Sequence, residues 1–436
     1  MKIKNQTKDD GTIIQVEENS TDSLNTNLLG YSNYVGYAED IGNIKCGKKT
    51  GEDAITIFVS KKLPTKQLAD SEILPKKING IQTDVLEIGE VFAGGGPPIA
   101  TDAQGLEDYK KKYRPIPMGV SHGNITITAG TTGGIVLIDG IKTIATNTHV
   151  ACENIRDDLS DQELKCCQQG AYDGGHTIND YYGRTLKAIV MPEGQPAFND
   201  FAVVMPDTPS DVLPETLTHH VTPTGTTKIA VNDKVWKEGR TTGYTIGEIL
   251  SLNATINVNY GGDGVVLHKY CILSTDMSAG GDSGSWVYKM NTPGDSITDE
   301  DKDVTLYLFA GSSTHTVHHD IHNAVSAVGG TIYTEEPVDP PTPPVNEIEV
   351  NVELTPEGEA ETFRVFGSVV TTTDKSPIHG CIVTVAGVNG NDTVTKTTMT
   401  DVKGKYNAVD CPVGYEYEVY YEATGYDVLI VALGDI

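Results

Sequence analysis

Apolar and polar residues alternate in many short runs along this chain. Alternation with a period of two, bounded by turn residues, is typical of half-buried β-strands. In the middle of the chain Gly, Asn and Asp separate such runs, which lie at 125–128, 134–138, 143–146, 201–205, 246–250 and 305–310. Many short strands with frequent turns predict a β-sandwich or barrel. One helix is predicted over 318–328, where Ile321, Ala324, Val325 and Val328 share a stripe.

Breaks in this pattern divide the chain into five parts. Residues 1–25 are polar and predict a poorly ordered tail. A small α/β accessory domain is predicted over 26–93, with strands at 54–60 and 83–88, and a Gly- and Pro-rich break follows it at 94–98. A β-rich domain then spans 99–334. A proline-rich stretch at 335–346 predicts a semi-rigid linker, and 347–436 predicts a separate β module with strands at 363–370, 381–385, 394–398 and 416–421.

The charge of the chain excludes some partners. Its 436 residues include 32 Lys and Arg against 60 Asp and Glu, a net charge of −28. A phosphate polymer would be repelled, so no nucleic-acid partner is predicted, and anionic membrane surfaces are disfavoured. No apolar run reaches the roughly 18 residues of a membrane-spanning helix. The polar N-terminus predicts no signal peptide, which favours the cytoplasm over a surface or particle-associated location without fixing the compartment.

Neither cysteine nor histidine spacing predicts a cofactor or a metal. The seven cysteines include no C-x-x-C pair. His315/His319 and His318/His322 have i, i+4 spacing, which places two imidazoles on one face of a helix. However, the Glu of an H-E-x-x-H motif is absent, and no third ligand is evident. The histidine run is therefore interpreted as the polar start of the predicted helix.

The string Ser-Ala-Gly-Gly-Asp-Ser-Gly-Ser-Trp at 278–286 carries the clearest chemistry. Glycines permit a tight turn, which can direct the backbone amides of Gly281 and Ser283 at one point as an oxyanion hole. The hydroxyl of Ser283 would project beside them. A serine hydroxyl is a weak nucleophile until a base removes its proton, so a histidine and an orienting acid are needed.

Two upstream strands end in suitable residues. An apolar strand at 143–146 leads into His149, and Asp200 stands at the start of another strand at 201–205. His149 is predicted as the general base and Asp200 as its orienter. Asp173 and Asp180 remain alternative acids, although Asp173 lies in a Tyr-Asp-Gly-Gly string that is typical of a turn.

The order His149, Asp200, Ser283 is that of the chymotrypsin arrangement. With Thr-Asn-Thr-His-Val at 146–150, Gly-Asp-Ser-Gly-Ser at 281–285 and Lys-Glu-Gly-Arg-Thr-Thr-Gly at 237–243, residues 115–330 resemble trypsin-like serine peptidases of a bacterial branch. The resemblance implies a chymotrypsin-like double β-barrel with the active site between the barrels, and a mainly β fold overall.

The sequence departs from that family at two positions. Met277 occupies the position where trypsin carries its specificity Asp, so cleavage after Lys or Arg is not implied. No Ile-Val-Gly-Gly start follows a basic cleavage site, which leaves the partner of Asp282 open.

The C-terminal module resembles a carboxypeptidase regulatory-like domain, a transthyretin-like β-sandwich, through its Gly-Tyr turns and strand order. The leading hypothesis is a serine endopeptidase acting on protein or peptide substrates. The alternatives are a non-catalytic peptidase-fold protein of an assembly and a self-processing protease. A protein partner through the C-terminal sandwich also stays open.

Overall fold

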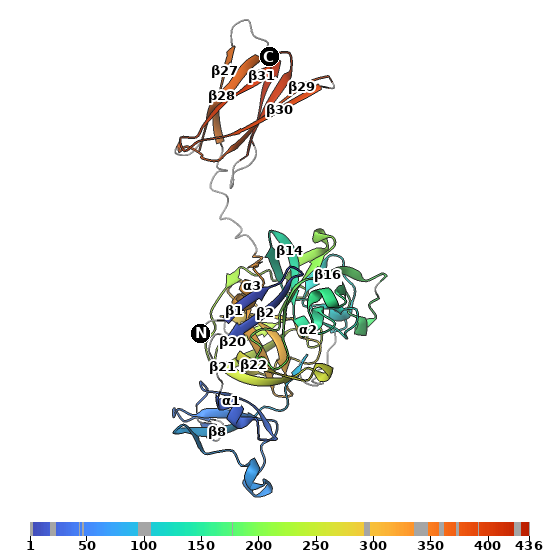
Figure 1. Ribbon diagram of the computed structural model, residues 1–436, viewed down its shortest axis with the longest axis vertical. Helices are drawn as coiled ribbons and strands as arrows, with labels where there is room; N and C mark the ends of the chain where they lie inside the picture. Colours follow the sequence, from blue (N-terminus) through green and yellow to red (C-terminus); the bar gives the residue numbers. More distant parts are fainter. Residues whose placement is uncertain are drawn as a thin grey trace. The chain divides into compact units, whose positions relative to one another are not determined.

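A computed structural model gives the fold (Figure 1). It describes residues 3–17, 23–42, 44–45, 48–94, 106–176, 178–291, 297–334, 348–356, 362–371, 375–390, 392–422 and 429–435. The whole of the predicted linker at 335–346 lies outside these described residues. The chain divides into two compact units, residues 1–336 and 337–436.

A first sheet of ten described strands positions the two predicted site residues that come first along the chain, His149 and Asp200. Its order is β12-β11-β15-β16-β17-β14-β13-β26, and β2 pairs in parallel with β16 while β1 pairs with β2. The strands are β1 Ile3–Thr7, β2 Thr12–Glu17, β11 Ser121–Asn124, β12 Gly130–Thr131, β13 Ile135–Ile138, β14 Ile141–Thr146, β15 Lys165–Cys167, β16 Tyr181–Val190, β17 Ala202–Pro206 and β26 Thr331–Ile332.

A second sheet of twelve described strands includes a closed barrel. Six strands run β20-β23-β24-β25-β22-β21, and β20 also pairs with β21, which closes the ring. These strands are β20 Lys234–Lys237, β21 Thr245–Asn259, β22 Val265–Thr275, β23 Trp286–Met290, β24 Asp303–Gly311 and β25 His315–Asp320. β19 Gly225–Thr226 joins β24.

N-terminal strands extend this second sheet. β3 Tyr34–Ala38 pairs with β21, and β6 Ile55–Val59, β8 Ile81–Glu87 and β7 Lys77–Ile78 follow outward. β9 Phe92–Ala93 pairs with both β21 and β24. Five strands that lie within the predicted accessory domain 26–93 therefore share a sheet with the barrel: β3, β6, β7, β8 and β9.

The remaining elements are short. Two separate strand pairs are β4 Ile44–Lys45 with β5 Lys48–Lys49, and β10 Ile116–Met118 with β18 Val212–Thr216. The helices are α1 Ser23–Leu28, α2 Thr148–Ala151 and α3 Ile321–Ala327. The 3-10 turns lie at Thr65–Gln67, Asp70–Glu72, Asp108–Lys110, Leu159–Asp161, Ala171–Asp173, Pro209–Asp211, Gly261–Asp263 and Asp299–Asp301.

The mainly β prediction is confirmed, and two local predictions need correction. Residues 3–17, predicted as a polar tail, form a hairpin because Ile13 is buried and β2 gains a partner in β16. The predicted helix over 318–328 begins only at Ile321, since His315–Asp320 pairs with β22 and β24 as a strand. Asp320 caps α3 by accepting a hydrogen bond from the Asn323 amide.

Aromatic side chains fill the core of the first unit. Trp236 stacks on Tyr288 with ring centroids 4.4 Å apart, and Phe201 meets Tyr307 edge-on at 5.1 Å. Phe201 immediately precedes β17 of the first sheet, Tyr307 lies on β24 of the second, and both belong to one buried cluster. This shared core fixes the two sheets against each other, and with them the residues that follow β14 and those that precede β23.

The described strands of the second unit form two sheets. Their orders are β27-β28-β31 and β30-β29-β32-β33. Val365, Val383, Val385 and Tyr421 belong to their common buried core. The strands are β27 Ile348–Pro356, β28 Thr362–Thr371, β29 Ile382–Asn389, β30 Asp392–Met399, β31 Lys405–Pro412, β32 Glu416–Glu422 and β33 Leu429–Asp435. The likeness to a carboxypeptidase regulatory-like domain stays a prediction.

Candidate active site

His149 and Asp200 lie in direct contact. β14 ends at Thr146, and His149 follows in the single turn of α2. Asp200 lies just before β17, which pairs with β14, so the two residues meet at the same ends of neighbouring strands. Nδ1 of His149 is 2.5 Å from Oδ2 of Asp200, and the backbone N–H of His149 donates to Oδ1 at 3.3 Å. The carboxylate therefore holds both the ring and the backbone of the histidine.

Asp200 is fully buried but stays ionised. Burial by itself would raise the pKa of this carboxyl, yet the neighbouring His149 and the hydroxyl of Tyr260 outweigh that effect, so the pKa lies below its usual range. The amide of Asp200 donates to the hydroxyl of Tyr307 at 3.1 Å. Because an ionised carboxylate only accepts, Nδ1 of His149 must carry the proton, and Nε2 is left as an acceptor in the neutral ring.

A buried chain of hydrogen bonds continues behind Asp200. The hydroxyl of Tyr260 donates to Oδ2 at 2.9 Å and contacts Nε2 of His268 at 2.9 Å. Nδ1 of His268 lies 3.1 Å from Nε2 of His319. Burial lowers the pKa of His268 to about 4, so this ring is neutral. Nothing in the sequence pointed to these residues, since no motif or spacing links Tyr260 and His268 to Asp200.

Ser283 stands in a tight turn that its glycines permit. Gly281 and Gly284 have φ values of +102° and +101°, a region that disfavours side chains. A Cβ on Gly284 would lie 2.2 Å from the carbonyl oxygen of Thr131. Oγ of Ser283 donates to the carbonyl oxygen of Phe309 at 3.1 Å. Within the described part of the chain, Nε2 of His149 is buried and has no hydrogen-bond partner.

Asp282 has an internal partner, which settles the point that the sequence left open. Its Oδ2 lies 3.5 Å from Nζ of Lys237, and both side chains are fully buried. Oδ1 accepts hydrogen bonds from the amides of Thr241 and Thr242, at 2.8 and 3.1 Å. The turn that carries Ser283 is thus held from within the chain, by an ammonium group and backbone amides.

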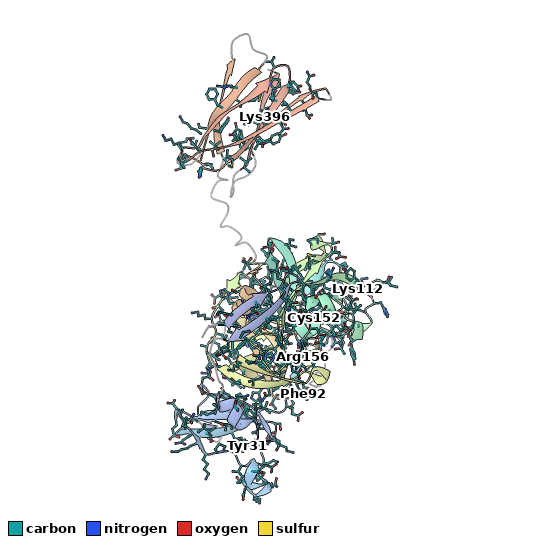
Figure 2. All side chains as sticks on the ribbon, in the orientation of Figure 1. Tyr31, Phe92, Lys112, Cys152, Arg156 and Lys396 are labelled. Atoms are coloured by element: carbon teal, nitrogen blue, oxygen red, sulfur yellow. The ribbon has the colours of Figure 1, made fainter. Side chains whose placement is uncertain are left out.

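The amide of Gly281, one of the two predicted oxyanion donors, is engaged. It donates to the carbonyl oxygen of Gly94 at 3.0 Å. Gly94 follows β9, and it lines a cavity of about 510 Å³ together with His149 and Gly281. Phe92, labelled in Figure 2, pairs with Asn259 of β21. The N-terminal part of the chain therefore reaches into the predicted site.

The alternative acids pair with other residues, and the histidine run is divided between a strand and a helix. Asp173 forms a bidentate ion pair with Arg240, and Asp180 pairs with Lys112. His315, His318 and His319 lie on β25 and His322 lies in α3, so neither His315/His319 nor His318/His322 shares a helix face. Among the residues described, no group of three or more His, Cys, Asp or Glu side chains is placed to hold a metal ion. Met277 is buried in an apolar cluster with Val235 and Ile249.

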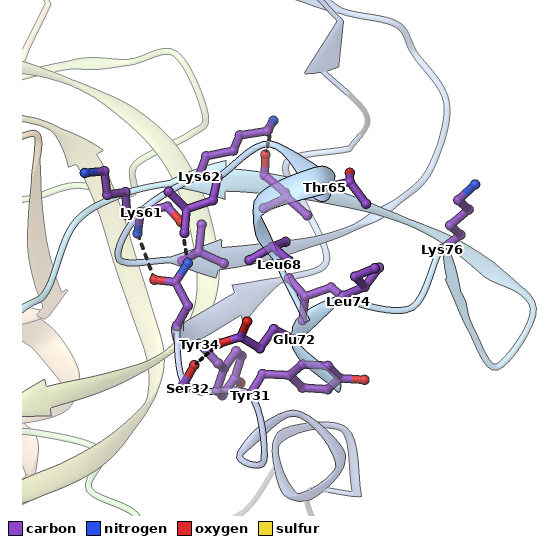
Figure 3. A pocket seen from close by; sticks show the side chains of 15 residues that line it. Tyr31, Ser32, Tyr34, Lys61, Lys62, Thr65, Leu68, Glu72, Leu74 and Lys76 are labelled. Atoms are coloured by element: carbon purple, nitrogen blue, oxygen red, sulfur yellow. Dashed lines mark hydrogen bonds between the residues drawn. The ribbon is translucent and has the colours of Figure 1, made fainter. Parts of the chain in front are cut away.

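A second cavity, of about 520 Å³, lies in the N-terminal part of the chain (Figure 3). Tyr31, Leu68 and Leu74 line it, and Oγ of Ser32 donates to Glu72 at 3.4 Å beside it. None of the residues predicted to carry the chemistry lines this cavity.

Comparison with known proteins gives matches to solved structures. No model of a protein family and no curated protein matches the chain. Thermobifida fusca protease A is 19% identical over 50% of this chain and 99% of its own, with a TM-score of 0.36. A glutamic acid-specific serine protease, described as using a histidine triad in substrate binding, is 18% identical over 50% of this chain and all of its own, with a TM-score of 0.36. Cellulomonas bogoriensis chymotrypsin is 19% identical over 50% of this chain and 99% of its own, with a TM-score of 0.34.

Among the described helices, none has the length and apolar character needed to cross a bilayer.

Proposed function

We propose that this chain is a serine endopeptidase in which Ser283 is the nucleophile, His149 the general base and Asp200 the residue that orients the base. The observation that carries the proposal is the 2.5 Å contact between Nδ1 of His149 and Oδ2 of Asp200. It fixes the tautomer that leaves Nε2 available as an acceptor, and Nε2 has no other partner among the described residues. An oriented base with an acceptor nitrogen to spare is one part of what acyl transfer by a serine requires.

In the reaction, Oγ of Ser283 turns from the carbonyl of Phe309 toward Nε2 of His149, which removes its proton as Oγ attacks the substrate carbonyl carbon. The amides of Gly281 and Ser283 receive the oxyanion of the tetrahedral intermediate. His149 then protonates the leaving amine, and the acyl group remains on Ser283 until water, activated by the same base, hydrolyses the ester. A rotation of Oγ is consistent with catalytic hydrogen bonds that form only when substrate binds.

Asp200 contributes by staying ionised while buried. Its carboxylate stabilises the imidazolium that forms when His149 accepts the proton. The ion pair of Lys237 and Asp282 contributes before any substrate arrives, because it holds the turn of Ser283 and Gly281 in place. Such preorganisation lowers the barrier, since the donors need not reorient during the reaction. The substrates proposed are proteins and peptides, and no cofactor takes part.

The test is hydrolysis of a denatured protein and labelling by a fluorophosphonate. Ser283→Ala should abolish both, while Ser285→Ala should retain most of the activity because this equally buried hydroxyl donates only to the carbonyl of Asp282. The carbonyl of Gly94 accepts a hydrogen bond from the amide of Gly281, one of the two proposed oxyanion donors. Both assays are therefore also run on a Gly94→Pro chain, which should lose this contact. Proline has no N–H to donate to Phe309 and cannot adopt the φ of +92° found at Gly94.

Equal hydrolysis by the Ser283→Ala and unaltered chains would reject the assignment. A folded Gly94→Pro chain whose Ser283 does not react would favour the alternative, in which the peptidase fold serves binding or assembly without catalysis.

A further inference from the structure

Residues 92–94 lie along β24 beside Ser283. β9 and β24 run antiparallel, with Ala93 opposite Ala310 and Phe92 opposite Gly311. The next residue, Gly94, is held on both sides of its backbone. Its N–H donates to the carbonyl oxygen of Phe309 at 3.2 Å, and its own carbonyl oxygen accepts from the amide of Gly281 at 3.0 Å.

These contacts are the ones that the acyl half of a peptide substrate needs. An extended peptide that adds to a strand edge gains main-chain hydrogen bonds irrespective of its side chains. A carbonyl that a nucleophile attacks must lie against donors that can receive the oxyanion. Gly94 satisfies both conditions at once. In addition, Oγ of Ser283 and the N–H of Gly94 donate to the same oxygen, that of Phe309.

We propose that the chain is its own substrate and that Ser283 cleaves the peptide bond joining Gly94 to Gly95. The inference rests on the proposed function. Oγ of Ser283 forms a bond to the carbonyl carbon of Gly94 while its proton passes to His149. The bond from that carbon to the nitrogen of Gly95 then breaks, and the nitrogen takes the proton from His149. Water hydrolyses the resulting ester, which leaves a carboxylate on Gly94 and a free amine on Gly95.

The fold itself delivers this substrate. β3 pairs with β21, and β6 and β8 extend the sheet, so the segment that carries Gly94 is tethered to the barrel before any reaction. Tethering makes the encounter intramolecular, and its rate constant should not depend on protein concentration. The same pairing should keep residues 1–94 attached after cleavage, so the two fragments should separate only under denaturing conditions.

The backbone at Gly94 offers a matched pair of variants. Gly94 has a φ of +92°, and a Cβ built on it meets nothing within 4 Å. Gly80 has a φ of +85°, also with nothing within 4 Å, but it lies in the turn between β7 and β8. Alanine at either position carries a similar conformational penalty, yet only Gly94→Ala places that penalty on the segment beside Ser283.

The experiment is intact-mass analysis and N-terminal sequencing of the full chain under denaturing conditions over time. The unaltered chain and Gly80→Ala should yield a new N-terminus at Gly95 with equal first-order rate constants at two protein concentrations. Gly94→Ala should be slower by roughly 5- to 30-fold, and Ser283→Ala should stay intact. An unaltered chain that stays intact, cleavage after Gly94 in Ser283→Ala, equal rates for Gly94→Ala and Gly80→Ala, or a rate constant that rises with concentration would each overturn the inference.

Labelling of the Gly94→Pro chain separates the two proposals. If its Ser283 reacts with a fluorophosphonate while the unaltered chain remains intact, the serine is reactive and self-cleavage alone is rejected. If Ser283 fails to react in a folded Gly94→Pro chain, the proposed function fails and the self-cleavage with it.

Discussion

Replacing Lys237 by methionine should destabilise the first unit by about 3 kcal/mol. The ammonium of Lys237 and the carboxylate of Asp282 are 3.5 Å apart, with neither side chain exposed. Methionine keeps much of the volume of lysine but removes the charge. The carboxylate would then be buried without a cation, and its remaining donors would be the amides of Ala279, Thr241 and Thr242 and the hydroxyl of Thr242.

The magnitude follows from two opposing effects. At 3.5 Å, two unit charges in a medium of effective dielectric constant 20 attract by about 5 kcal/mol. Burial lowers the pKa of Lys237, although Asp282 acts in the opposite direction, so part of this attraction offsets the cost of dehydrating the ammonium. Breaking a buried pair by removing one partner costs about 3–5 kcal/mol. The four hydrogen bonds that Asp282 keeps place the expected loss at the lower end of that range.

Urea unfolding followed by tryptophan fluorescence measures the effect, because the chain has two tryptophans, Trp236 and Trp286, and both lie in the first unit. Asp282→Asn should cost about 2 kcal/mol less in the Lys237→Met background than in the unaltered chain, since the two charges are coupled. Lys289→Met is the matched control, because the pair of Lys289 with Asp233 on the same barrel is partly exposed and should be worth less than about 1 kcal/mol. A Lys237→Met chain within about 0.5 kcal/mol of the unaltered one, or additive single variants, would refute the reasoning.

Three further predictions concern the histidines and the carboxylate of the site. Burial lowers the pKa values of His122 and His318 to about 3, so the unfolded chain binds more protons below pH 6.5. Between about pH 6 and the folded-state pKa of about 3, each histidine should therefore reduce the free energy of unfolding by about 1.4 kcal/mol per pH unit. Urea midpoints that do not decrease when the pH is lowered from 6 to 5 would contradict this. Asp200→Asn should lower kcat by roughly 10³- to 10⁴-fold in the Gly94→Pro background, because the amide favours the wrong tautomer of the base, and unchanged hydrolysis would remove the proposed role. Tyr260→Phe should lower kcat about tenfold without changing KM, because it removes one hydrogen bond to the carboxylate that is worth about 1.5 kcal/mol. An effect on KM alone would instead indicate a contact with substrate.

The strand pattern and the local motifs were enough to predict much of the fold and part of the candidate site. The alternation at 143–146 and 201–205 predicts strands that pair as β14 and β17, and this pairing brings His149 and Asp200 together. Both residues belong to short strings whose local chemistry is visible in sequence. Their catalytic roles stay predictions.

What the sequence could not predict depends on pairing between distant segments. Tyr260 reaches Asp200 only because the second sheet packs on the first, and no local pattern encodes that contact. The partner of Asp282 is 45 positions upstream, at Lys237, and the string at 237–243 gives no sign of that pairing. The hairpin at 3–17 contains enough polar residues to be interpreted as a tail, although Ile13 finds a buried position against β16.

The pairing of β3 with β21 has a practical consequence for shortened chains. Gly36 of β3 lies so close to β21 that a Cβ on it would be 2.2 Å from the carbonyl oxygen of Thr255. In β21 the side chains of Ala254, Thr255 and Ile256 are all buried. A recombinant fragment starting at residue 106 would present this stretch of β21 as a bare, apolar strand edge, which is a template for edge-to-edge aggregation. Expression of the first unit from residue 106 onward should therefore yield insoluble or self-associated material, whereas supplying residues 1–94 as a separate polypeptide should restore a soluble complex.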